Sequence, residues 1–413
     1  MFGMAFPCAR STSIQVHCSF SLRVSATASF LPGIVSRSMV ASWLFWGAAF
    51  GIAYSYFGYG VWLWIRSRLF PRSVRAGVSC PFISIIMIVR NEAALLPRKL
   101  QNLDQLNYPA NRMEIIVVSD GSQDNTGNIL SAAAGDRRFR ILLGPQARGK
   151  AAGLNRAAHA ARGEILVFTD ARQKIEPEAI KLLMENFSDS DVGCASGQLM
   201  LGDPDAGEPA KGMGLYWKYE KWIRQLESAS GSVIGSTGAI YAMRRDLFVD
   251  LPEETVLDDV YLPMNVLRQG ARVIFDPRAR AWDASSMGDQ KEFRRKVRTL
   301  SGNYQLLQLA PWLLGKSNPA RFRFVSHKLL RLVVPLLLAT ALVAAFLLPA
   351  TIYRIALVLQ LVFYASSALK FLGTSRGPLA RISDAAFTLL LLNTAAVVAF
   401  VNFIFRRKPV WSA

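Results

Sequence analysis

Charged side chains follow directly on three apolar stretches of the chain. The run "FISIIMIVR" ends at Arg90 with Glu92 close behind, "MEIIVVSDG" reaches Asp120, and "EILVFTDAR" reaches Asp170 and Arg172. Continuous apolar runs of this length are typical of strands buried on both faces. The carboxyl ends of parallel strands meet at one edge of a sheet, where open α/β folds bind their ligands. The three ends therefore predict one polar site, although an Asx turn would also explain Asp120.

The stretches between these runs predict the fold class. Helical patterns cover about 91–104, 123–134 and 150–161. Alternating β and α units favour an α/β domain with a parallel sheet and helices on both of its faces.

Two further segments carry charge at predicted helix starts. Lys150 follows a glycine in "RGKAAGLN", where its ammonium and the helix N-terminus would both attract a diphosphate. Asp258 and Asp259 open the stretch "LDDVYLPMNVLRQG". A solvated lysine and simple helix capping are the alternatives, since acidic residues are favoured in a first helical turn.

The distribution of charge separates a central region from two basic flanks. The chain has 413 residues, a net charge of +19 and 52% hydrophobic residues. Residues 92–292 hold 28 of the 29 acidic residues and 24 of the 48 basic ones, a balance of −4. The flanks are basic and apolar, which indicates a membrane surface rather than a nucleic acid as partner. Four scattered cysteines and three histidines show no metal-ligand spacing.

Four segments are long and apolar enough to predict membrane spans, at 41–65, 329–350, 353–372 and 383–405. Arg66 begins a basic cluster directly after the first, which places the following domain in the cytosol by the positive-inside rule. Buried core helices are the alternative.

The two chain ends leave open questions. Four spans would place the basic residues of the tail outside, so either one C-terminal segment does not span or this short tail is tolerated. Residues 1–38 are a targeting peptide or the product of a start assigned too early, with Met39 as the true start. The expected organisation is an extension at 1–38, a transmembrane helix at 39–66, an α/β domain at 80–300, a membrane-interface segment at 301–326, about three transmembrane helices at 327–405, and a tail at 406–413.

The central region resembles the family 2 glycosyltransferases, which have a GT-A fold. The matching stretches follow in the family's order over about 82–300 and are "SIIMIVRNEAALLPRKLQNL", "IIVVSDGSQDNT", "GKAAGLNRAAHAARGEILVFTDA", "SGQLML", "STGAIYAMRR" and "LDDVYLPMNVLRQGARVIFDP". With membrane segments on either side, the chain is similar to membrane-embedded members such as the synthases of hyaluronan, cellulose and poly-N-acetylglucosamine. The resemblance implies inverting transfer from a nucleotide sugar, usually a UDP-sugar, to an acceptor hydroxyl.

The resemblance also implies roles for individual residues. Asp259 would be the general base that deprotonates the acceptor, and Asp258 would tune it by like-charge repulsion. The acceptor-side segment would be Ser236, Thr237 and Gly238. The donor would be bound by Arg90, Glu92, Asp120 at the nucleobase edge, Lys150 at the diphosphate, Asp170, Arg172, Arg295 and Arg298.

Two departures from the family pattern limit what the resemblance implies. The family's D-x-D motif holds a divalent metal, but here it reads Asp170-Ala171-Arg172. Asp170 could still bind Mg²⁺ or Mn²⁺ together with the diphosphate and water, or Arg172 could contact the phosphates itself. The Q/R-x-x-R-W motif of processive members matches at Arg295 and Arg298, but a threonine replaces the tryptophan. Long-chain synthesis and single transfer therefore both remain open.

These observations predict a membrane-bound inverting glycosyltransferase that acts on a lipid-linked or polysaccharide acceptor. We expect it in a bacterial inner membrane with its catalytic domain in the cytosol, where a partner subunit of a polysaccharide-synthesis complex could bind it. The alternative is a catalytically silent, nucleotide-binding or scaffolding subunit of such a complex. A transporter ranks last, because the apolar segments lack buried ionisable residues.

Overall fold

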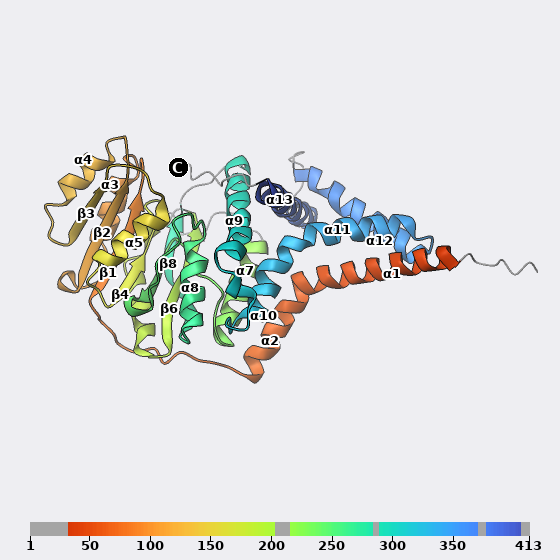
Figure 1. Cartoon of the computed structure of the whole chain (residues 1–413), viewed down its shortest axis with the longest axis horizontal. Helices are drawn as coiled ribbons and strands as arrows, with labels where there is room; N and C mark the ends of the chain where they lie inside the picture. The colour runs from red at the N-terminus through yellow and green to blue at the C-terminus, as the bar shows by residue number, and fades with distance from the viewer. Residues whose placement is uncertain (1–31, 203–214, 284–288, 371–376, 406–413) are drawn as a thin grey trace, which may run out of the picture.

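The computed structural model describes residues 32–202, 215–283, 289–370 and 377–405. The expectations for residues 1–31 and for the tail lie outside these ranges. Figure 1 shows an α/β part built around a twisted sheet, with long helices that project from one side of it.

The sheet has eight strands in the order β3-β2-β1-β4-β7-β6-β8-β5. The first half is parallel, whereas β7 runs antiparallel to both of its neighbours and β5 runs antiparallel to β8. The α/β class is therefore confirmed, but the sheet is mixed, because β7 lies between β4 and β6 and runs antiparallel to both. The strands are β1 (Ile83–Val89), β2 (Met113–Asp120), β3 (Phe139–Gly144), β4 (Ile165–Phe168), β5 (Lys174–Ile175), β6 (Val192–Leu201), β7 (Tyr241–Arg244) and β8 (Arg272–Asp283).

Both faces of the sheet are covered, as the unbroken apolar strands require. All seven residues of β1 are buried, and their side chains alternate between two cores. Ile86 and Ile88 belong to the core under α5 and α8, whereas Ile85 and Met87 belong to the core under α3, α4 and α6. These helices are α3 (Leu96–Asp104), α4 (Thr126–Ala133), α5 (Lys150–Ala160), α6 (Ala179–Glu185) and α8 (Asp258–Arg268).

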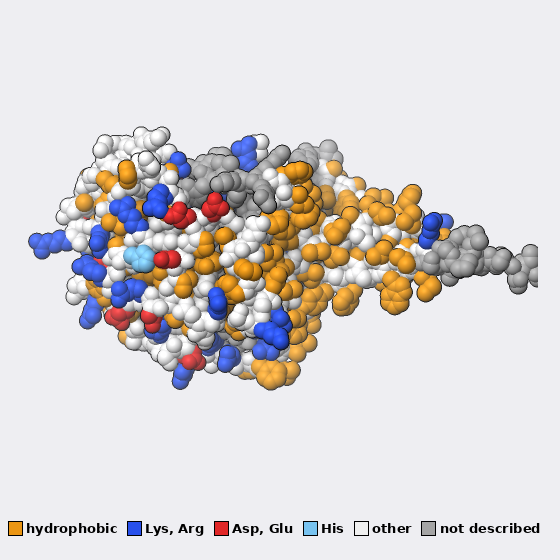
Figure 2. All heavy atoms as spheres, viewed as in Figure 1, with side chains coloured by type: hydrophobic (Ala, Val, Ile, Leu, Met, Phe, Trp, Pro, Cys, Tyr) orange, Lys and Arg blue, Asp and Glu red, His pale blue; other side chains and the backbone are white. Residues whose placement is uncertain are grey.

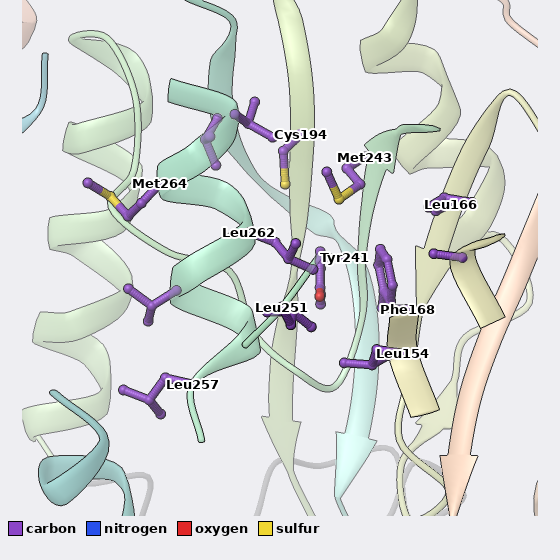
Figure 3. Close-up of a cluster of buried hydrophobic side chains, with 14 of the residues drawn as sticks. Leu154, Leu166, Phe168, Cys194, Tyr241, Met243, Leu251, Leu257, Leu262 and Met264 are labelled. Carbon is purple, nitrogen blue, oxygen red and sulfur yellow. The ribbon is translucent and has the colours of Figure 1, made fainter. Parts of the chain in front are cut away.

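One buried cluster joins the end of β4 to α8. Phe168 of β4 stacks on Tyr241 of β7, with ring centroids 4.6 Å apart. Leu154 of α5 and Leu262 of α8 pack into the same cluster (Figure 3). This packing holds four elements together at the carboxyl edge of the sheet, next to the charged residues described below.

The helical part contains one N-terminal helical segment and three C-terminal helices. The N-terminal segment runs without a break through α1 (Pro32–Ala53), η1 (Tyr54–Gly58) and α2 (Tyr59–Leu69). The C-terminal helices are α11 (Leu330–Leu347), α12 (Thr351–Ser366) and α13 (Pro378–Ile404). Phe45 and Ala48 of α1 pack against Ala341 and Ala344 of α11. Figure 2 shows hydrophobic side chains over most of the visible surface of this part.

Three helices in the described part of the chain are long and apolar enough to cross a membrane: 321–347, 351–370 and 379–404. They coincide with the three C-terminal spans expected from the sequence. The N-terminal helix is not among them, because its Trp, Tyr, Ser and Gly residues lower the mean hydropathy. Trp43 and Phe50 on this helix are nevertheless 77% and 73% exposed. A membrane span for this helix stays a prediction.

A buried polar network attaches the helices to the α/β part. On α7 (Leu215–Ala229), the Glu227 carboxylate accepts a hydrogen bond from Tyr59 Oη at 2.6 Å and lies 2.9 Å from His327 Nδ1 in η7 (Val325–Leu329). Arg323 of α10 (Arg321–Phe324) donates to the carbonyl oxygens of Glu227 and Ser230 at 2.6 and 2.8 Å. The network fixes how the helices meet α7.

Candidate active site

Asp120 shapes the loop that presents Lys150. Its two carboxylate oxygens accept the backbone N–H groups of Arg148 and Gly149 at 2.7 and 2.9 Å. Gly149 has φ of 94°, in the left-handed region that favours glycine, and Lys150 is the first residue of α5. Asp120 therefore organises the start of α5, and its contact with a nucleobase stays a prediction.

The loops after β1 and β2 are also joined to each other. Asn91, at φ of 53°, accepts the N–H of Gln123 at 2.8 Å. Thr126 accepts the N–H of Glu92 at 3.0 Å, and Asp124 accepts the N–H of Thr126 at 3.0 Å. These contacts set Glu92 at the same sheet edge as Asp120.

Lys150 connects the end of β4 with the start of α8. Its Nζ lies 3.0 Å from Asp170 Oδ1 and 3.2 Å from Asp258 Oδ1. Burial disfavours the charge on the Lys150 ammonium, but Asp170, Asp258 and Asp259 outweigh it and raise the lysine pKa above its ordinary value. Three of the residues predicted from separate stretches of sequence thus meet at one point.

Asp259 follows Asp258 at the start of α8, and the pKa of its carboxyl group is raised. Burial, together with the negative charge of Asp258, raises the pKa of Asp259 to about 6, against the opposing charges of Lys150 and Lys328. A carboxylate in this condition is ionised near neutral pH and is a better proton acceptor than an ordinary aspartate. This is the condition that the predicted general base needs.

The segment Ser236–Gly238 packs against the start of α8. A Cβ atom added to Gly238 would lie 3.4 Å from Asp170 Oδ2 and 3.8 Å from Asp259 Oδ2. The backbone N–H of Thr237 donates to Ser196 Oγ at 3.1 Å. The missing side chain of Gly238 therefore leaves room for about a methyl group next to both carboxylates.

Helix α9 (Asp289–Leu309) supports the loop before α8. A Cβ atom on Gly302 would meet Leu257 Cγ at 2.6 Å, so α9 approaches Leu257 closely. Gln305 accepts the N–H of Val256 at 3.0 Å and donates to the carbonyl of Glu254 at 2.7 Å. The helix runs without interruption across residue 300.

The two arginines expected on this helix are not brought to Lys150 and its partners. Arg295 Nη2 lies 2.8 Å from Glu292 Oε2 of the same helix, and Arg298 is exposed. Arg90 is half-buried directly after β1. Donor binding by these three arginines stays a prediction.

Arg172 has a carboxylate partner that the sequence analysis missed. Its Nη2 lies 2.6 Å from Oδ2 of Asp283, which ends β8 and is 1% exposed. Glu92 is near enough to respond electrostatically: burial raises its pKa, Arg172 opposes this, and Asp170 adds to it. A signal for Asp283 existed, since it is an acidic residue at the end of a strand pattern in which apolar and charged residues alternate, in "ARAWD".

Arg224 of α7 was also missed. It donates to Ser196 Oγ at 2.7 Å, and its guanidinium lies 4.5 Å from the centre of the Phe275 ring. Burial lowers the pKa of Arg224, and nearby carboxylates including Asp259 oppose the shift. Nothing in the helical pattern of α7 distinguishes this arginine from an exposed one.

The residues around Asp170 fit a divalent metal only when a bound substrate supplies further oxygen atoms to the ion. In the described ranges no three His, Cys, Asp or Glu side chains form a metal-binding group. The Asp170 side chain is 40% exposed, so one carboxylate is available next to the space beside Gly238. Mg²⁺ commonly binds proteins through one or two carboxylates plus substrate phosphates, and Asp170 fits this mode.

A cavity of about 490 Å³ opens at the ends of β2 and β3. It is lined by Asp120, Leu143, Arg148, Arg156 and Glu253, among others. Its lining includes neither Lys150 nor the acidic residues that contact Lys150. We therefore take the candidate reacting centre to be at Lys150, Asp170 and Asp258 and not in this cavity.

Comparison with known proteins identifies the class. Residues 84–251 match the model of the family described as glycosyl transferase family 2. A mannosyltransferase from Pyrobaculum calidifontis, solved with GDP-Man and Mn²⁺, aligns with a TM-score of 0.66 at 22% identity. The alignment covers 87% of this chain and 99% of that one, and it shows a GT-A fold. The chain therefore contains a family 2 glycosyltransferase domain, as the motifs predicted.

The curated relatives make different products. Beta-monoglucosyldiacylglycerol synthase of Nostoc sp. is 26% identical over 48% of this chain and 43% of its own length. Poly-beta-1,6-N-acetyl-D-glucosamine synthase of Staphylococcus aureus is 23% identical over 54% of this chain and 55% of its own length. The chain spans about half the length of the curated relatives it matches.

Proposed function

We propose that the protein is a membrane-bound, inverting glycosyltransferase that moves a sugar from a nucleotide sugar to a hydroxyl of a lipid-linked or glycan acceptor. The contact of Lys150 with both Asp170 and Asp258 carries this proposal. It joins the residue at the end of β4, on the donor side, to the acidic pair that holds the base. The relatives act on a lipid and a glycan, which supports both acceptor classes.

The chemistry follows from the positions of these groups. Asp259 removes the proton from the acceptor hydroxyl, and that oxygen attacks the anomeric carbon of the donor sugar. A new C–O bond forms while the bond from that carbon to the diphosphate breaks on the opposite face. The proton stays on Asp259, and the nucleoside diphosphate leaves with its bonding electrons. The attack from the opposite face inverts the anomeric configuration.

The other charged residues assist this displacement. Lys150 and the N-terminus of α5 bind the diphosphate and stabilise the charge that develops on it. The backbone of Ser236–Gly238 leaves room for the acceptor beside Asp259. Mg²⁺ or Mn²⁺, held by Asp170, supplies further neutralisation of the leaving diphosphate when bound.

The helices suggest where the reaction takes place. Three apolar helices, together with the apolar N-terminal segment, support a position of the α/β part next to a lipid bilayer. Arg66 and Arg68 end α2, which favours a cytosolic position for the domain that follows. We propose a bacterial plasma membrane, with acceptors supplied from that bilayer.

Release of nucleoside diphosphate tests the function. The full chain in lipid vesicles would be incubated with UDP- and GDP-sugars, with membrane lipid extract as acceptor. We expect release from one donor, with a loss of roughly 10²- to 10⁴-fold in Asp259→Asn, the range for a general base. Asp104→Asn, an exposed carboxylate on α3, is the matched control and should keep wild-type activity. No release from any donor by the wild type would reject the proposal.

A further inference from the structure

A buried lysine on α3 contacts the segment that carries Asp170. Lys99 is 2% exposed. Its Nζ donates to Thr169 Oγ1 at 3.0 Å and to the carbonyl oxygen of Gln173 at 2.8 Å. Thr169 and Gln173 lie on either side of the stretch from Asp170 to Arg172, so one ammonium bridges both ends of the turn.

This lysine is costly to bury. An ammonium group loses its hydration on burial, and that loss is normally offset by a carboxylate partner. Within the described residues, no ion pair joins Lys99 to a carboxylate. Burial lowers its pKa to about 7, and the negative charge of Asp170 opposes that shift. A methionine would fill the same space without this cost, so packing alone does not account for the lysine.

A second residue of α3, Asn102, also joins this helix to the segment after β4 and therefore serves as a comparison for Lys99. Asn102, one helical turn after Lys99, donates from Nδ2 to the carbonyl of Ile175 and accepts the N–H of Ile175, both at 2.8 Å. It secures β5, beyond the turn. Lys99 and Asn102 therefore tie the same helix to the same segment, but only Lys99 bridges the two sides of Asp170.

The contact of Lys99 continues toward the acceptor segment. Thr169 Oγ1 donates to the carbonyl oxygen of Ala239 at 3.0 Å, and Ala239 follows Gly238 directly. Thr169 can donate this bond because the Lys99 ammonium, which has no lone pair, can only donate to it. The hydrogen bonds therefore run from Lys99 to Thr169 and from Thr169 to Ala239.

We propose that Lys99 is a positioning residue that holds the turn between Thr169 and Gln173 so that Asp170 faces the diphosphate of the donor. This inference rests on the proposed function. Lys99 contacts the backbone and a side chain of the turn, not the donor.

Binding of nucleoside diphosphate to the full chain in lipid nanodiscs tests this role. UDP and GDP would each be titrated with Mn²⁺ by calorimetry, and thermal unfolding would be measured on the same samples. In Lys99→Met we expect roughly 10- to 100-fold weaker binding, the loss typical of residues that orient a ligand-binding group. Asn102→Ala should lower the unfolding temperature, because it removes two buried hydrogen bonds to Ile175, but leave binding within about twofold of the wild type. Lys181→Met, an exposed lysine on α6, should change neither.

The outcomes separate the two proposals. Wild-type protein that binds neither UDP nor GDP would reject the proposed function, and this inference with it. Binding that is unchanged in Lys99→Met, or that weakens equally in Lys99→Met and Asn102→Ala, would overturn the positioning role alone. If Lys99→Met does not fold, Thr169→Val removes the hydroxyl that Lys99 contacts with little change in volume. That variant should still weaken nucleotide binding, and unchanged binding in it would overturn the inference.

Discussion

Ser236 donates two hydrogen bonds to the backbone carbonyl of Asp259, from its N–H at 2.7 Å and from its hydroxyl at 3.0 Å. The predicted acceptor segment and the predicted base are therefore held together by the main chain. This contact uses the backbone of Asp259 and leaves its carboxylate facing the space beside Gly238. Several measurable consequences arise from this arrangement.

The pH dependence of the reaction should report Asp259. Its pKa is raised to about 6, chiefly by burial and by Asp258, and it acts in its ionised form. We therefore expect kcat/KM to be constant near neutral pH and to fall about tenfold per unit as the pH drops below about 6. Initial rates of diphosphate release from about pH 5 to about pH 8 would measure the profile. A rate independent of pH over this range would exclude Asp259 as the base.

Gly238→Ala should impair activity without unfolding the protein. The added methyl group would lie 3.4 Å from Asp170 Oδ2, an ordinary van der Waals contact, so stability should change by less than about 0.5 kcal/mol. It would occupy the space between the two carboxylates, and a misplaced reactant costs on the order of 10²-fold in rate. Rates and thermal unfolding of the same preparation would test this. Gly127→Ala on α4, where nothing lies within 4 Å, is the control. Full activity in Gly238→Ala would show that the reaction occurs elsewhere.

Metal removal should affect the reaction through Asp170. We expect EDTA to lower activity by at least about tenfold and Mn²⁺ or Mg²⁺ to restore it, because the metal neutralises the leaving diphosphate. Asp170→Asn should lower the apparent metal affinity, measured as the concentration needed for half-maximal rate. Activity that persists in EDTA would instead favour Arg172 as the group that contacts the phosphates.

The junction between the helices and the α/β part should contribute to stability. Glu227 is 1% exposed, and its carboxylate accepts from Tyr59 and lies beside His327. Glu227→Gln keeps the shape but weakens both contacts, so we expect a loss of about 1–3 kcal/mol in the free energy of unfolding. Thermal unfolding in lipid nanodiscs would measure it. Glu178→Gln, an exposed carboxylate on the loop before α6, should change stability by less than about 1 kcal/mol. Equal stability of the two variants would contradict a structural role for the junction.

Local sequence patterns predicted the α/β class and the residues at the strand ends. Asp120, Lys150, Asp170 and the pair at Asp258 each follow an apolar run or open a helix, and both signals depend only on local pattern. Parallel strands then bring their ends to one edge whatever the remaining topology. The three C-terminal apolar helices were equally predictable from the sequence, because their length and composition alone identify them.

The contacts between these side chains depend on strand order and helix packing, which local patterns do not encode. β7 lies beside β4, and β8 beside β6, although the chain visits them in another order. That order places Gly238 between Asp170 and Asp259, and it pairs Arg172 with Asp283 across more than a hundred residues. Lys99 is buried against the same segment because α3 packs over β5, a contact that no local pattern encodes. Arg295 pairs with Glu292 on α9, and the contacts of this helix with α13 and Leu257 come from distant parts of the chain.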